Sequence, residues 1–201
     1  TERKHMSHAS FSFAYKKATQ ALNFFARQAG GGLDKLKALK LVFFADRYHV
    51  RKYGRLITND EYWAMDYGPV ASGVKDLAEL SRFLGEQERA YAQKFLRPAS
   101  DENLFESTAE VEEAVLSATD LEALRFAWER FGGCDAITLY RLTHRYPEWK
   151  RHEVALASGD VSRVLIAYED FLENAELALE PCYSLTLEEQ ADRFGALAGE
   201  R

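Results

Sequence analysis

The chain has 201 residues, of which 47% are hydrophobic, so it is long enough to bury a core without disulfides or metal ions. Its formal net charge is −6, and it contains no run of 18 apolar residues that could cross a membrane. Its two cysteines form no CxxC pair, which argues against a disulfide scaffold and favours a cytoplasmic protein. Lys and Arg are concentrated in residues 1–56, but too sparsely to favour nucleic acid as a partner.

The N-terminal quarter predicts two helices. Residues 1–10 are polar, and we expect them to be frayed. Apolar residues at three- and four-residue spacing predict a helix over 11–28. Asp34 is expected to cap a second helix over 35–53, which Gly54 closes.

One carboxylate of the second helix stands out, because Asp46 falls on its apolar stripe. A buried carboxylate needs hydrogen-bond donors or a cation nearby. Arg47, Arg55 and the N–H groups of the following segment are the candidates, and we expect Asp46 to be structural.

A small β-hairpin is predicted next. Two β-prone runs, 55–58 and 62–65, are separated by turn residues. Gly68-Pro69 is expected to end the second strand, because proline has no N–H for a ladder. Ser72 would then cap a helix.

The middle of the chain predicts a connection followed by helices. Residues 86–106 are highly charged and are expected to form an irregular connection with one short helix. Capping boxes beginning at Ser107 and Thr119 predict two helix starts, and Gly132 ends the second of these helices.

The C-terminal part predicts three further helices. Asp135 is expected to cap the first, Asp160 a long amphipathic helix over 161–175, and Thr186 a last short one. The fold class predicted is therefore mainly α, a compact helical domain with one small β-hairpin.

Catalytic and metal-binding patterns are not evident. The sequence has no phosphate-binding glycine motif and no His/Cys set at ligand spacing, so we expect no cofactor, no metal and no enzymatic activity. An enzymatic alternative would require Asp46 and His144 to meet in a cleft. We expect His144 to be a structural histidine, and Trp149 to anchor its turn in the core with an acceptor for its N–H.

Two segments together resemble a known family. "ALKLVFFADRYHVRKYGRLITNDEYWAMDYGPVASGVKDL", residues 38–77, resembles the core motif of the Panacea domain, also called the SocA-like antitoxin domain. "LTHRYPEW", residues 142–149, resembles the second motif of that family. We therefore expect a Panacea domain over 11–178 and a C-terminal extension with a short helix over 179–201.

The resemblance implies a function. Members are antitoxins of bacterial and phage toxin–antitoxin pairs, and they neutralise a cognate toxin by direct protein contact. One branch of the family is a proteolytic adaptor that delivers its toxin to a cytosolic ATP-dependent protease, and this alternative stays open.

The corner at Gly68-Pro69 is the expected toxin-binding surface. Aromatic and methionine side chains on a rigid support suit a protein interface. The same residues could instead only tie the hairpin onto the second helix, and both interpretations can hold together. The residues expected to bind toxin are Tyr62, Met65, Tyr67, Gly68, Pro69 and Val70.

Overall fold

The computed structural model describes residues 12–176 and 185–199, so the predictions for residues 1–10 and for the start of the C-terminal extension lie outside the described residues. The α-helices are α1 (Tyr15–Gln28), α2 (Lys35–Tyr53), α3 (Ser72–Glu79), α4 (Glu86–Ala92), α5 (Ala118–Phe131), α6 (Ala136–Thr143), α7 (Pro147–Lys150), α8 (Glu153–Ala157) and α9 (Leu187–Gly199). Two 3₁₀ helices are η1 (Glu113–Val115) and η2 (Tyr168–Leu172). The strands are β1 (Gly32–Asp34), β2 (Tyr62–Met65), β3 (Gly68–Ala71), β4 (Leu96–Pro98), β5 (Leu104–Ser107) and β6 (Arg163–Leu165).

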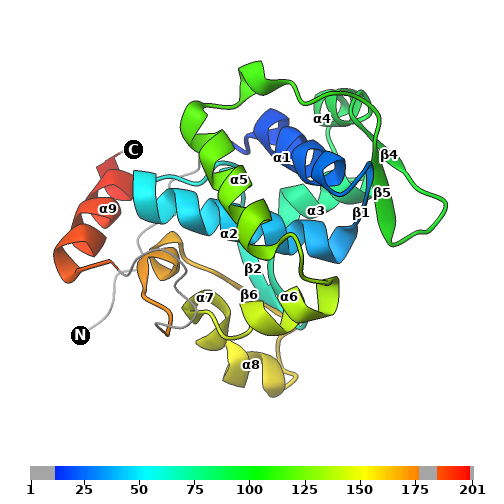
Figure 1. The fold of residues 1–201 in the computed structure, drawn as a ribbon. Helices are drawn as coiled ribbons and strands as arrows, with labels where there is room; N and C mark the ends of the chain where they lie inside the picture. Colours follow the sequence, from blue (N-terminus) through cyan, green and yellow to red (C-terminus); the bar gives the residue numbers. More distant parts are fainter. Residues whose placement is uncertain (1–11, 177–184, 200–201) are drawn as a thin grey trace.

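Helix α2 crosses the middle of the molecule (Figure 1). Asp34 caps it by accepting a hydrogen bond from the N–H of Lys37, and Gly54 ends it with a φ of +80°. Both boundaries agree with the prediction. Between Ala38 and Arg51 nearly every side chain is buried, because α1, α3, α5 and α6 all pack against α2. The core of the domain is therefore built around this helix.

Two three-stranded antiparallel sheets accompany the helices, in the orders β1-β5-β4 and β3-β2-β6. The expectation of one small hairpin is thus incomplete. Strand β2 pairs with β3, not with residues 55–58, and Gly68-Pro69 begins a strand instead of ending one. Pro69 is tolerated because β3 lies at the edge of its sheet.

Two predicted helix starts are wrong. Ser107 ends strand β5, so its capping box is not used. The box at Thr119 is displaced by two residues, because Ser117 caps α5 and exchanges hydrogen bonds with Asp120.

The long helix expected over 161–175 is also wrong. Residues Arg163–Leu165 pair with β2 as strand β6, and η2 follows. A short apolar run is compatible with either a strand or a helix. Here residues 163–165 form a strand because they pair with the edge of β2 that β3 leaves open. The last helix, α9, forms after Thr186, which exchanges hydrogen bonds with Glu189 as a capping box does.

Within the described ranges, none of the helices combines the length and the apolar character that a membrane span requires.

Candidate protein-binding site

The turn between β2 and β3 is held through its backbone carbonyl oxygens. The indole N–H of Trp149 donates to the carbonyl oxygen of Met65 at 2.7 Å. Nε2 of His144 lies 3.0 Å from the carbonyl oxygen of Asp66, the next residue along. Trp149 therefore has the acceptor that its buried N–H requires. The second motif, 142–149, thus supports the turn of the first.

A third support comes from inside the core. Lys40 of α2 is fully buried, and its Nζ donates to the carbonyl oxygen of Pro69 at 2.9 Å. Burial lowers the pKa of Lys40 from its usual 10.5 to about 7. Gly68 has a φ of +89°, and a Cβ there would lie 2.7 Å from Oγ1 of Thr143 and 3.0 Å from Nζ of Lys40. The backbone is therefore packed closely against the buried lysine at this corner.

The supported turn presents one largely exposed aromatic residue. Tyr67 is 67% exposed, and Met65 is half-buried. Tyr62 and Val70 are also expected to contact the toxin, but they are buried: Tyr62 has no exposed surface and Val70 only 7%. Pleating explains the difference between Tyr62 and Met65, because alternate side chains of β2 point to opposite faces. Gly68 and Pro69 are also buried, so a partner reaching this corner would meet Tyr67 first.

The same corner borders a surface groove. It has a volume of about 750 Å³. Hairpin residues form one wall, α2 a second, and α3 and the β4–β5 loop the rim. Its apolar lining residues are Leu36, Leu39, Met65, Tyr67 and Val70, and its polar lining residues are Asp34, Lys35, Lys75, Glu79, Glu102 and Asn103.

Asp46 fixes the segment that leads into the hairpin. One carboxylate oxygen accepts from the N–H of Ile57 at 2.6 Å and of Thr58 at 3.2 Å. The other accepts from the hydroxyls of Thr58 at 2.5 Å and Tyr62 at 2.8 Å. Burial raises the pKa of Asp46 to about 6 in spite of these four bonds. Of the candidate partners, the backbone N–H groups of Ile57 and Thr58 bond to Asp46, whereas Arg55 donates to Asp120.

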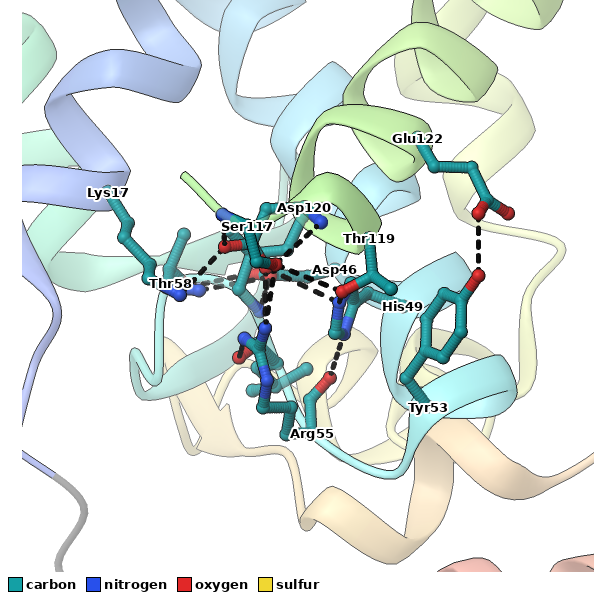
Figure 2. A network of polar contacts seen from close by, with 12 residues as sticks. Lys17, Asp46, His49, Tyr53, Arg55, Thr58, Ser117, Thr119, Asp120 and Glu122 are labelled. Atoms are coloured by element: carbon teal, nitrogen blue, oxygen red, sulfur yellow. Dashed lines mark hydrogen bonds and ion pairs between the residues drawn. The ribbon is translucent and has the colours of Figure 1, made fainter. Parts of the chain in front are cut away.

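Arg55 instead joins a second polar network, which Figure 2 shows beside Asp46. Asp120 accepts from Lys17 at 2.7 Å, from Arg55 at 2.8 Å and from the N–H of Ser117 at 2.9 Å. Burial alone would raise the pKa of Asp120, but these bonds hold it below its usual range. Buried His49 lies 3.3 Å from the same carboxylate. The network ties α1, α2 and α5 together.

The geometry does not assemble a catalytic centre from the candidates. Asp46 bonds to the 57–62 segment, whereas His144 lies against the carbonyl oxygens of Tyr140 and Asp66, so the two side chains are not partners. Among residues 12–176 and 185–199, no group of three or more His, Cys, Asp or Glu side chains is placed to hold a metal ion.

Sequence reasoning missed two features of this site. Lys40 lies within the quoted motif but received no role, although a lysine between Leu39 and Leu41 in a buried helix was a visible signal. The helix predicted over 161–175 includes Arg163, and no local signal in the sequence indicates that this residue pairs with β2.

These features define a mainly helical domain whose two sequence motifs meet at one rigid, partly exposed corner. The family model for the antitoxin SocA-like, Panacea domain matches residues 39–150, which is more than half of the chain. The chain belongs to this family. No curated protein and no solved structure was found to match it.

Proposed function

We propose that this protein is the antitoxin of a bacterial or phage toxin–antitoxin pair and neutralises its toxin by direct contact at the β2–β3 turn. One observation carries the proposal: Lys40, His144 and Trp149 all hold backbone carbonyl oxygens of this corner, while Tyr67 stays exposed. A turn that is already ordered loses little conformational entropy on binding, which favours affinity. Exposed tyrosines at such positions are frequent binding hot spots.

Contact at this corner would neutralise a toxin by covering its active surface or blocking substrate access. The mechanism needs no catalysis by this chain. The groove beside Tyr67 would admit apolar side chains of the toxin next to Met65, so that the aromatic tip and the groove act as one surface.

Tyr67→Ala is the direct test. The probe is the protein encoded by the reading frame next to the gene for this chain, co-expressed with each variant in a growth-rescue assay and then measured by biolayer interferometry. We expect Tyr67→Ala to lose about 30-fold in affinity, corresponding to about 2 kcal/mol for a hot-spot aromatic. Its melting temperature should stay within about 2 °C of the parent, because the side chain is largely exposed.

Phe83→Ala is the matched control. Phe83 is 74% exposed but does not line the groove, so its loss should leave rescue unchanged. If Tyr67→Ala and Met65→Ala both rescue growth with parental affinity, the interface lies elsewhere. Nuclease treatment should leave the complex intact, because the contact proposed is between proteins.

The adaptor alternative predicts a different fate for the toxin. An antitoxin that acts by binding leaves the toxin level unchanged, whereas an adaptor lowers it through an ATP-dependent protease. An immunoblot of the toxin with and without that protease therefore separates the two functions.

A further inference from the structure

The outward face of the sheet β3-β2-β6 continues the surface of the groove. Residues paired across antiparallel strands point to the same face. Trp63 pairs with Val70 and with Leu165, and Met65 pairs with Arg163. Since Met65 and Val70 line the groove, Trp63 and Arg163 extend the same face toward the free edge of β6.

Arg163 is held in place on this face without an anionic partner. Its guanidinium carbon lies 4.4 Å from the centroid of the Trp63 ring, a cation–π contact. The side chain is exposed, and within the described residues it forms no ion pair. A planar guanidinium fixed by stacking keeps its fork of donors available to a carboxylate.

The cations on the groove rim differ from Arg163 because they already have acceptors in the chain. Nζ of Lys75 lies 2.8 Å from the carboxylate of Glu79, and Nζ of Lys35 donates to the carbonyl oxygen of Glu102 at 2.6 Å. A negatively charged group of a partner would therefore bind most favourably at Arg163.

We infer that the toxin docks through an apolar segment that carries a carboxylate, with the apolar side chains in the groove beside Met65 and the carboxylate on Arg163. This inference rests on the proposed function and specifies the chemistry of its partner. A single carboxylate suits the site better than a nucleic acid, because the chain has a net charge of −6 and would repel a polyanion.

The test compares charge variants at Arg163 in the same rescue and binding assays, again with the protein encoded by the neighbouring reading frame as the probe. We expect Arg163→Gln to weaken binding about 10-fold and Arg163→Glu about 100-fold, because reversal adds repulsion to the lost pair. Arg163→Lys should fall between the parent and Arg163→Gln, since it keeps the charge but loses the stacked fork. The affinity of the parent should also fall with added salt more steeply than that of Arg163→Gln.

Arg82→Glu is the matched control. Arg82 also lies over an aromatic ring, 5.1 Å from the centroid of Phe83, and is exposed outside the groove. The same charge change there should leave binding within about 2-fold of the parent. A thermal melt of each variant excludes unfolding as the cause of a loss.

The outcomes separate this inference from the function on which it rests. If the parent does not rescue growth, the proposed function fails. If the parent rescues, and Arg163→Glu binds as tightly as the parent or no more weakly than Arg82→Glu, the carboxylate contact is refuted while the antitoxin role stands. Recovery of binding to Arg163→Glu by a toxin variant with Lys in place of one Asp or Glu would identify the partner residue.

Discussion

Replacing Lys40 with methionine should stabilise the domain and at the same time loosen the corner. The fall in the pKa of Lys40 from 10.5 to about 7 corresponds to about 5 kcal/mol of destabilisation for the buried ammonium, at 1.36 kcal/mol per pKa unit. Lys40→Met removes this cost but leaves the buried carbonyl of Pro69 without its donor, which costs about 1–3 kcal/mol. The destabilisation that is removed exceeds the cost of the unpaired carbonyl. We therefore expect the free energy of unfolding to rise by about 3 kcal/mol at pH 6.5, or roughly 6–12 °C in Tm.

The difference in stability between the parent and Lys40→Met should depend on pH. Because the folded state holds the proton of Lys40 more weakly than the unfolded state, its cost is fully present below pH 7 and is relieved as the pH rises toward 10.5. Urea unfolding should therefore show the parent gaining about 2–3 kcal/mol between pH 6.5 and 9 relative to Lys40→Met. The reasoning is refuted if Lys40→Met is less stable than the parent at pH 6.5, or if both proteins have the same slope with pH.

Substitutions at three further positions, Asp46, Gly68 and Trp149, test the contacts that hold the corner. Asp46→Ala should cost about 3 kcal/mol, because four buried donors lose their acceptor. Burial raises the pKa of Asp46 to about 6, so its contribution to stability falls as the pH rises from about 4 to 6; Asp46→Asn should abolish that decline in urea titrations. Gly68→Ala should cost about 2 kcal/mol or more by thermal melt, because of its positive φ and the 2.7 Å contact, whereas Gly133→Ala meets nothing within 4 Å and should change stability by less than about 0.5 kcal/mol. Trp149→Phe should cost about 1–2 kcal/mol and speed amide hydrogen exchange at the turn, since the carbonyl oxygen of Met65 loses its donor; unchanged exchange would contradict the supporting role.

Local signals in the sequence predicted the central helix well, because its boundaries depend on nearby residues. Asp34 bonds three residues ahead, and Gly54 needs only its own backbone freedom. Local signals alone do not fix the first residue of α5. Ser117 and Thr119 offer overlapping caps, and the choice of Ser117 places Asp120 where Lys17 and Arg55, distant in sequence, can reach it.

The strand pairings could not be predicted, because they depend on contacts between distant segments. The N–H groups of Ile57 and Thr58 donate to Asp46, so they are not available to a ladder with β2. Strand β6 lies about a hundred residues beyond β2, and its short apolar run carries no local mark of its partner. For the candidate site, the sequence indicated Met65 and Tyr67 but not which face of β2 would be buried, and that depended on Asp46 binding the hydroxyl of Tyr62.

The supports of the turn act on main-chain oxygen atoms, and this separates the shape of the corner from the identity of its tip. Trp149 and His144 bind carbonyl groups that every amino acid possesses. Residues 66 and 67 can therefore be exchanged for others with little effect on the backbone that carries them. If the toxin binds this corner as proposed, a library randomised at these two positions should consist mostly of folded members that differ in the protein they bind.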